Sequence, residues 1–466
     1  MRRVHPNGLY PQCREHGKSD KGSMVLVRLI PSRILRNVHR NTFHHFFLAG
    51  IALSFLVVPF TVCAQADPGI TLHYTHHIFH VPYATMTRWR RDREQWEFRG
   101  VPVMVPASFR VDGDIIPLLP EGFARSTIVE WDLPLLEQYL RTTIAPSIDR
   151  AAGKVTITDE GGVLTFDGVG FPGRELQLRR SAVLIAEALH AGVQTVYLVV
   201  EETPPLVQVQ SQELQSRGVR ELVAFGESDY RGSPPNRAHN ILTGLRRFNG
   251  SRIARGAIFS FNRILGRVGP ETGYRKELTI LGERTIPDYG GGLCQVSTTA
   301  YRGAWEAGFP ILQRRNHSYT VRYYAPQGTD ATIYPPTVDF QFQNNSPGDL
   351  IVQTHAQDGR AYFLYYGTRE TRQVRLMGPY TWDRKEPPSP RSETTTEIPE
   401  GTTRKVGEAT PGMHAAWFRL VTESGTGALL EPVYSIYEAR PLFTQIGVAS
   451  GTTLPAPDWL EIDPSS

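Results

Sequence analysis

Residues 290–299 read GGGLCQVSTT, so that one cysteine, Cys294, follows three glycines and a single leucine. Glycine accepts backbone conformations that other residues avoid, and this run predicts a sharp turn that leaves the sulfur uncrowded. The apolar periodicity that follows predicts a helix, with Cys294 in its first turn. There, unpaired N–H groups and the helix dipole favour thiolate over thiol. A free cysteine is usually a small buried hydrophobe, and this alternative stays open beside the interpretation as a nucleophile.

The basic residues of the chain are concentrated at its N-terminal end. Residues 1–45 carry a net charge of +7 while the whole chain carries +4, which leaves −3 for residues 67–466. The basic pI therefore describes the leader, and the remainder gives no indication of a nucleic-acid partner. With 466 residues, of which 40% are hydrophobic and 21% charged, the chain is long enough for two or three folded domains.

An uncharged run, FFLAGIALSFLVVPFTVCAQA at residues 46–66, follows the basic stretch. It is typical of the apolar core of an export signal, and Ala64-Gln65-Ala66 fits a cleavage site. The run is also nearly long enough for an uncleaved membrane anchor, so both alternatives stay open, as do Met1 and Met24 as starts. The positive-inside rule predicts an exported chain, at the extracytoplasmic face of the membrane or in the cell wall. Cleavage would leave Cys294 as the only cysteine and exclude an intramolecular disulfide.

The hydrophobic patterns predict a multi-domain α+β chain. Helices are expected at 133–147, at 176–192 and from the residue after Pro234-Pro235 to Asn249-Gly250, with a β-hairpin at 155–166 and a strand at 256–262. Strands are expected after the Cys294 helix, at 318–324, 331–334, 338–343, 350–356 and 361–366, and this order favours α+β over an alternating parallel sheet. The expected divisions are a basic leader with signal peptide or anchor (1–66), a first α+β domain (67–215), a second domain containing Cys294 (216–372), a linker or exposed arm (373–410) and a small β-rich region (411–466).

A cysteine nucleophile needs a base and a group that orients the base. The nearest downstream histidine is His317, at the start of a predicted strand, and Asp330 precedes the next predicted strand. On adjacent antiparallel strands the two side chains would face the helix N-terminus together. Cys294, His317 and Asp330 are therefore the candidate catalytic residues. A loop histidine and a turn-capping aspartate are the alternatives, because such triads are recognised by geometry and not by chain order.

Several neighbours of these residues are candidates for binding substrate. Gln295 either donates to an oxyanion or caps the helix, and Asn316 and Ser318 either orient His317 or settle a turn. Tyr319 and Arg322 are equally suited to contact with an anionic substrate and to a place on a half-exposed strand. The full set of candidates is Gly292, Gln295, Asn316, Ser318, Tyr319 and Arg322.

No metal and no cofactor are expected from the sequence. The three histidines His76, His77 and His80 have no carboxylate or cysteine at helical spacing, and we interpret them as surface or strand histidines. A lone cysteine is a poor zinc site, because zinc takes several nitrogen or sulfur ligands.

Six segments lie in a fixed order between residues 258 and 345: IFSFN (258–262), GY (273–274), GGGLCQVSTT (290–299), RNHSY (315–319), GTDAT (328–332) and DFQFQNN (339–345). Together they resemble the VanW family. The glycine–cysteine segment is the most specific of them. The resemblance identifies 216–372 as a VanW-like domain, and the stretch before it resembles a peptidoglycan-binding region that often precedes such domains.

The resemblance implies work on the cell wall, with peptidoglycan stem peptides and glycan as partners, and the cytoplasmic membrane as a further partner if the anchor is uncleaved. Some members of the family are understood as L,D-transpeptidases. Carried over, Cys294 would form a thioester with a donor tetrapeptide, an acceptor amine would resolve it, and His317 would act as base. Two alternatives stay open: a peptidase in which water resolves the thioester, and a non-catalytic wall-binding or glycopeptide-resistance accessory protein.

Overall fold

The computed structural model describes residues 69–104, 121–281, 284–423 and 427–454. The leader and the uncharged run expected as signal or anchor lie outside these residues. The described residues belong to one compact unit, Ala64–Ser466, built from several small sheets and short helices. The predicted α+β class is confirmed. Within the described ranges, no helix is long and apolar enough to cross a membrane.

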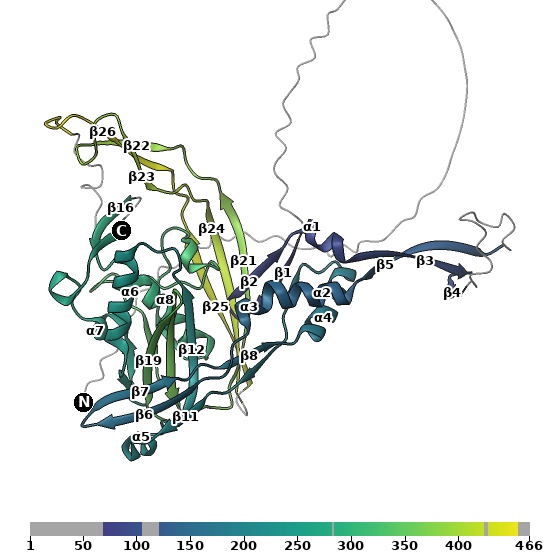
Figure 1. Cartoon of the computed structure of the whole chain (residues 1–466), viewed down its shortest axis with the longest axis horizontal. Coiled ribbons are helices and arrows are strands. Elements are labelled where there is room, and N and C mark those ends of the chain that lie inside the picture. The colour runs from purple at the N-terminus through teal and green to yellow at the C-terminus, as the bar shows by residue number, and fades with distance from the viewer. Residues whose placement is uncertain (1–68, 105–120, 282–283, 424–426, 455–466) are drawn as a thin grey trace, which may run out of the picture. The chain divides into compact units, whose positions relative to one another are not determined.

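The central sheet is antiparallel, in the order β12-β20-β19-β13. Its strands are β12 (Glu221–Asp229), β20 (Arg360–Gly367), β19 (Leu350–Gln357) and β13 (Arg252–Ile253). The helices α8 (Leu293–Glu306) and α6 (Pro235–Phe248) lie alongside it (Figure 1). A Cβ on Gly303 would lie 2.8 Å from the backbone nitrogen of Gly226, so two glycines permit α8 to approach β12 closely.

A large aromatic and aliphatic core fills the space between this sheet and the two helices. Its fully buried members include Phe248, Phe259, Trp305, Phe342 and Tyr365. Burial of such large side chains contributes roughly 1.5–3 kcal/mol each relative to exposure, which fixes the position of α8. The N-terminal end of α8, where Cys294 lies, is therefore carried by a rigid element.

A second sheet, in the order β14-β18-β17, flanks the core. Its strands are β14 (Ile258–Ser260), β18 (Gln341–Gln343) and β17 (Ile311–Gln313). The strand expected at 256–262 ends early, because the Ser260 hydroxyl accepts the N–H of Arg263 and begins the short helix α7 (Phe261–Leu265). The strand expected at 338–343 is shorter than predicted, whereas those at 350–356 and 361–366 are present as β19 and β20.

Two strands expected after the Cys294 helix are wrong. Residues 318–324 contain only a 3-10 turn, η5 (Arg322–Tyr324), and residues 331–334 form isolated bridges. At the end of the first stretch and in the loop that follows it, the buried guanidinium of Arg302 donates to the carbonyls of Tyr324, Ala325 and Thr329 at 2.8–3.2 Å. Backbone acceptors satisfied by a side chain need no neighbouring strand.

The N-terminal part contains the predicted hairpin and helices. The hairpin is β6 (Lys154–Glu160) with β7 (Val163–Val169), and β11 (Leu206–Val209) pairs with β6. The helix expected at 133–147 runs through α2 (Leu133–Tyr139), a π-type turn at Leu140–Ile144 and α3 (Ala145–Ile148), and that expected at 176–192 is α4 (Leu178–His190). These helices share a core with the sheet β2-β1-β9. The remaining strands here are β1 (Ile70–Tyr74), β2 (His77–Val81), β3 (Arg90–Phe98), β4 (Val101–Val103), β5 (Phe123–Trp131), β8 (Gly173–Leu176), β9 (Thr195–Tyr197) and β10 (Val200–Thr203).

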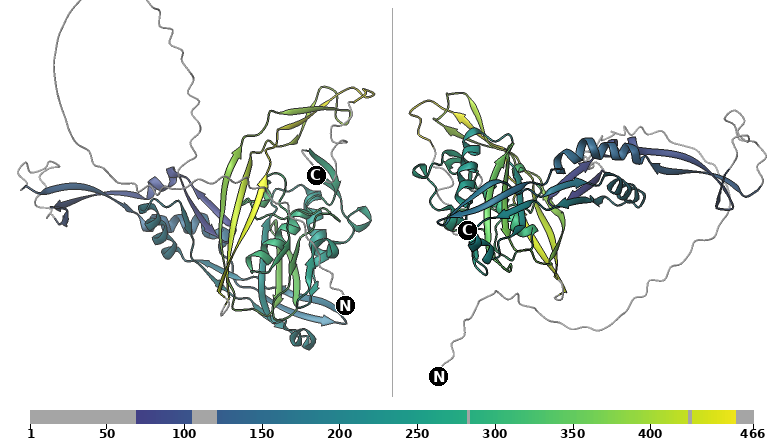
Figure 2. Two further views of the ribbon diagram at one scale, coloured as in Figure 1. Left: turned by 180° about the vertical axis from the view of Figure 1, so that it is seen from behind. Right: turned by 60° about the horizontal axis from the view of Figure 1, so that its bottom comes forward.

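Residues 373–410, which the sequence predicts to be a linker or exposed arm, include regular strands. They contain β21 (Gln373–Lys385), β22 (Arg391–Thr395) and β23 (Thr403–Gly407). β21 pairs with β24 (Gly412–Glu423), which pairs with β25 (Gly427–Tyr437), and Figure 2 shows these three long strands side by side. β22 and β23 both pair with β26 (Phe443–Gly447). The partner strands come from later in the chain, so local composition gave no sign of them.

The three-stranded sheet β21-β24-β25 takes part in the main core. Trp417 of β24 is fully buried, packs edge-on against Trp305 of α8 at 5.7 Å, and donates its indole N–H to the Gln327 carbonyl at 2.7 Å. Because Trp417 belongs to the main core, the expected division between residues 216–372 and the region after 410 does not separate two cores.

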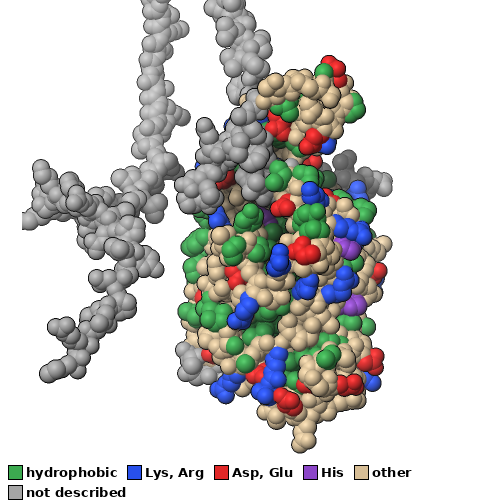
Figure 3. Space-filling view, turned by 90° about the vertical axis from the view of Figure 1, so that its left-hand side faces the viewer, with side chains coloured by type: hydrophobic (Ala, Val, Ile, Leu, Met, Phe, Trp, Pro, Cys, Tyr) green, Lys and Arg blue, Asp and Glu red, His purple; other side chains and the backbone are tan. Residues whose placement is uncertain are grey.

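On the face drawn in Figure 3, acidic and basic side chains are interspersed among hydrophobic and polar ones.

Candidate active site

Cys294 is the second residue of α8, directly after a turn that requires glycine. Gly290 and Gly292 have φ angles of +83° and +113°, and a Cβ on Gly292 would lie 3.1 Å from the carbonyl oxygen of Arg237. A side chain at Gly292 would be strained by both its φ and its neighbours. Gly292 thus shapes the turn, and no side chain there crowds the thiol.

The thiol is half-buried and free. Its sulfur lies 3.5 Å from the hydroxyl of Thr332 and 3.8 Å from the carbonyl oxygen of Ile333. The Cys294 N–H is one of the four that a helix leaves without an intrahelical acceptor. In the described part of the chain no other acceptor takes it either, whereas the flanking Leu293 and Gln295 N–H groups donate to Gly290 and Gly292. The Cys294 N–H is therefore a candidate donor to a substrate oxygen.

The structure brings His317 and Asp330 together beside this thiol. The His317 Nδ1 lies 2.6 Å from the Asp330 Oδ2, and the same oxygen accepts the His317 backbone N–H at 2.8 Å. Both residues are buried. Because Nδ1 is engaged by the carboxylate, Nε2 is the ring nitrogen left for the sulfur. The two residues lie on loops, and not on the adjacent strands expected from the sequence.

The electrostatics of the three groups favour an ion pair. Burial raises the pKa of the Cys294 thiol, but the hydrogen bond and charge of His317 outweigh it and lower this pKa to about 7. Burial lowers the pKa of His317, but hydrogen bonds with Asp330 and Cys294 raise it to about 9. Burial also opposes the charge on Asp330, yet His317 and Arg314 hold its pKa well below the ordinary value. At neutral pH the arrangement therefore favours thiolate, imidazolium and carboxylate.

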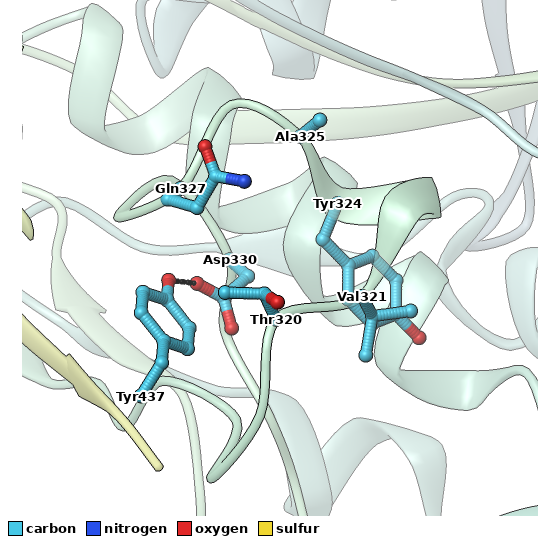
Figure 4. A pocket seen from close by; sticks show the side chains of 7 residues that line it. All are labelled: Thr320, Val321, Tyr324, Ala325, Gln327, Asp330 and Tyr437. Atoms are coloured by element: carbon cyan, nitrogen blue, oxygen red, sulfur yellow. Dashed lines mark hydrogen bonds between the residues drawn. The ribbon is translucent and has the colours of Figure 1, made fainter. Parts of the chain in front are cut away.

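Sequence reasoning missed the residues that hold the imidazole and the carboxylate. The Tyr324 ring stacks on His317 with centroids 4.4 Å apart, and Arg237 donates to the Tyr324 hydroxyl at 3.4 Å. Arg314 donates to Asp330 Oδ1 at 3.3 Å, and the Tyr437 hydroxyl donates to the same oxygen (Figure 4). Arg314 directly precedes the RNHSY segment and could have been suspected. Nothing in the sequence links Tyr437 to a residue 107 positions earlier.

Two of the predicted substrate-binding side chains, Gln295 and Asn316, make hydrogen bonds within the protein. The Gln295 amide is fully buried, accepts from Arg237 at 3.0 Å and donates to the Asp229 carbonyl at 3.4 Å. Its side chain therefore does not reach an oxyanion beside the sulfur. Asn316 donates to the carbonyls of His317 and Ile436 at 2.8 and 2.7 Å, so it fixes the loop that carries the histidine.

The other predicted binding residues differ in exposure. Ser318 is exposed, and its carbonyl accepts the Glu438 N–H at 2.7 Å. Tyr319 is buried beneath the Arg440 guanidinium, which lies 5.4 Å from the ring centroid. Arg322 is exposed and stacks on Tyr323 at 4.7 Å. Ser318 and Arg322 are therefore accessible to a ligand, whereas Tyr319 is a packing residue.

A shallow pocket lies beside Asp330 (Figure 4). Its lining comes from the loop that contains η5 and from Tyr437 of β25. The residues around it are Thr320, Val321, Tyr324, Ala325, Gln327, Asp330 and Tyr437. Asp330 and Tyr324, which both contact His317, thus also line this pocket.

A second histidine–carboxylate cluster lies elsewhere in the fold and was not predicted. His76 is buried against Glu306 of α8, and His77 Nε2 lies 3.0 Å from Glu227 of β12. His77 and His80 do lie on a strand, β2, as expected, but the carboxylates that meet His76 and His77 come from more than 100 residues away.

The donors of this cluster, His76, His77 and Glu227, lie close enough together for a metal site. However, Glu227 is already paired with Arg174, and Arg150 and Arg360 approach it to 3.6 and 4.0 Å. A divalent cation would add positive charge to a site where arginines already exceed the carboxylates. We therefore interpret the cluster as an ion-pair network.

Comparison with known proteins finds similarity to a family in the segment that contains Cys294. Residues 236–366 match the family described as VanW like protein, so the predicted VanW-like domain is confirmed. The chain is 30% identical over 139 residues to the uncharacterized protein YoaR of Bacillus subtilis (strain 168), covering 30% of this chain and 46% of that protein. It is 28% identical over 116 residues to the vancomycin B-type resistance protein VanW of Enterococcus faecalis (strain ATCC 700802 / V583), covering 24% of this chain and 42% of that protein.

The chain thus spans less than half the length of either of these curated relatives. No solved structure matches it. The matched segment contains Cys294, His317 and Asp330, but ends before β21. The peptidoglycan-binding domain expected before it stays a prediction.

Proposed function

We propose that this protein is an exported cysteine acyl-transferase of the L,D-transpeptidase type, which forms cross-links between peptidoglycan stem peptides. The observation that carries the proposal is the Cys294–His317–Asp330 arrangement at the N-terminus of α8, with a thiol pKa lowered to about 7. A thiolate is the nucleophilic form of cysteine, and a structural cysteine needs no such activation. The likeness of this domain to a vancomycin-resistance protein supports a substrate in the cell wall.

In the first half-reaction the Cys294 thiolate attacks the carbonyl carbon that precedes the terminal D-amino acid of a donor tetrapeptide. A C–S bond forms, and the negative charge moves to the carbonyl oxygen, where the Cys294 N–H stabilises it. The C–N bond then breaks, and the departing amine takes the proton of the His317 imidazolium. The products are a thioester on Cys294, a neutral imidazole and the free D-amino acid.

In the second half-reaction an acceptor amine attacks the thioester carbon. Neutral His317 takes the proton that the amine loses, and the C–S bond breaks to release the thiolate. The thiolate–imidazolium pair is thereby restored. Asp330 keeps the ring in one tautomer and orientation throughout, since its Oδ2 holds both Nδ1 and the backbone N–H of His317.

The test is to incubate the purified protein with disaccharide tetrapeptides and to analyse the products by mass spectrometry. We expect a cross-linked dimer with loss of one terminal D-amino acid for each bond, and none with Cys294→Ala. Absence of any cross-linked product, or full activity of Cys294→Ala, would overturn the proposal. Release of the D-amino acid with a free tripeptide as the sole product would instead indicate a peptidase that uses water as acceptor.

A non-catalytic wall-binding role is separated by the chemistry of the thiol itself. The rate of Cys294 alkylation by iodoacetamide should follow a titration with its midpoint near the lowered pKa of about 7. A thiol that stays inert at neutral pH would indicate a packing residue. Export, which the proposal requires, is tested by locating the protein in fractionated cells.

A further inference from the structure

The last residue of β25 reaches the carboxylate of the triad from outside the matched VanW-like segment. Tyr437 is buried, with 4% of its side chain exposed. Its hydroxyl donates to Asp330 Oδ1 and accepts the Gly328 N–H at 2.7 Å (Figure 4). Both the side chain of Asp330 and the backbone leading to it are therefore bound to one phenol.

The residues around Tyr437 bind the same loop along its length. Arg314 donates to the Ser435 hydroxyl at 2.8 Å and to Asp330 Oδ1 at 3.3 Å. The Ile436 carbonyl accepts from Asn316 at 2.7 Å, and the Glu438 N–H donates to the Ser318 carbonyl at 2.7 Å. The end of β25 thus forms one wall of the loops that carry the histidine and the aspartate.

The two oxygens of Asp330 have different tasks. Oδ2 binds the ring and the backbone of His317, while Oδ1 is bound by Tyr437 and Arg314. The terminal torsion of an aspartate is broad, so a carboxylate held only at Oδ2 rotates more freely than one held at both oxygens. Burial and the charge of Asp330 raise the pKa of Tyr437, which keeps its phenol protonated and able to donate.

We propose that Tyr437 is a positioning residue of the active site, so that the C-terminal sheet β21-β24-β25 completes the catalytic unit that begins at α6. This inference rests on the proposed function. It extends that unit beyond residues 236–366 and predicts that the VanW-like segment alone holds Asp330 poorly.

The test compares Tyr437→Phe with Tyr434→Phe, a matched change on the same strand at a side chain that is 61% exposed. Two readouts are measured on the full chain: the pH dependence of Cys294 alkylation by iodoacetamide, located by mass spectrometry, and kcat and KM for transfer. We expect Tyr437→Phe to raise the alkylation midpoint by roughly one pH unit and to lower kcat about tenfold, with KM little changed. Tyr434→Phe should match the wild type.

The two readouts separate the failure of this inference from that of the proposed function. An ordinary wild-type thiol with no transfer would overturn the proposed function. A wild-type midpoint near 7 that Tyr437→Phe leaves unchanged would overturn this inference alone. If Tyr437→Phe does not fold, Ser435→Ala replaces it, because Ser435 acts on the same carboxylate through Arg314. A smaller upward shift supports the inference, and an unchanged midpoint overturns it.

Discussion

Two buried histidine–carboxylate contacts in this molecule have opposite electrostatics. His317 meets Asp330 beside a thiol, and its pKa rises to about 9 although burial alone would lower it. His77 meets Glu227 at a similar distance, but burial and the neighbouring His76 lower its pKa to about 4. A carboxylate at hydrogen-bonding distance therefore does not by itself create an imidazolium.

The difference comes from what else binds each carboxylate. Asp330 has one arginine, Arg314, and faces a thiol that can itself become an anion, so the local balance favours a positive ring. Three arginines approach Glu227, and their positive charges largely balance its negative charge. Burial then leaves His77 neutral. The first site therefore suits the proton transfer that we propose, whereas the second connects strands that are distant in the sequence.

The largest effect is expected from removal of the imidazole at the first site. His317→Ala should lower kcat by roughly 10⁴–10⁶, because removal of one member of a triad loses most of the joint effect. It should also raise the pKa of Cys294 above its value of about 7, since the hydrogen bond and charge of His317 no longer oppose the effect of burial. Steady-state kinetics and iodoacetamide titration measure the two effects. His80→Ala, at an exposed histidine, is the control and should change neither.

At the second site the expected loss is stability and not activity. Arg174→Met leaves Glu227 buried without its closest partner and should lower the free energy of unfolding by about 3 kcal/mol. Urea unfolding measures this, and the alkylation midpoint of the folded variant should stay at the wild-type value. Arg179→Met, which breaks an exposed pair with Glu137, should cost at most about 1 kcal/mol. Equal losses in the two variants would contradict the assignment of a buried network.

The two histidines should also affect stability at opposite ends of the pH range. The lowered pKa of His77 means that the unfolded chain binds a proton that the folded chain rejects, so stability falls as pH drops from 6.5 to 4. For His317, with its pKa raised to about 9, the contribution is complete below pH 6.5 and is lost as pH rises through 9. Measured between pH 6.5 and 5, His77→Gln should remove about 2 kcal/mol of the acid loss. An acid loss equal to that of the wild type would show that His77 is not buried in its neutral form.

The contrast also marks what the sequence could predict. The turn and helix around Cys294 follow from local rules, because three glycines and an apolar period act within ten residues. His317 and Asp330 were found by chain order and family likeness, although the strands expected to carry them are loops held by Arg302 and Arg314. Local sequence patterns predict helices and strands, but the backbone carbonyls of these loops accept hydrogen bonds from arginine side chains and not from a neighbouring strand.

Contacts between residues that are far apart in the sequence could not be predicted from it. Tyr437 binds Asp330, and His76 binds Glu306, across 107 and 230 residues. The strands within residues 373–410 could not be predicted for the same reason, since β21 pairs with β24 and β22 pairs with β26. In each case the free energy that fixes the residue comes from a partner that no local window contains.

The smallest effect is expected from the hydroxyl of Tyr324, and it tests which part of the first site positions the imidazole. The Tyr324 ring stacks on His317 at 4.4 Å, whereas its hydroxyl receives only a long bond of 3.4 Å from Arg237. Tyr324→Phe keeps the ring and should change kcat by less than about threefold, because such a bond contributes under about 1 kcal/mol. Tyr324→Leu removes the aromatic face and should cost more in kcat than in KM. If the two variants lose activity equally, the Arg237 bond and not the stacked ring sets the orientation of His317, and the positioning of the base extends through Arg237 to α6.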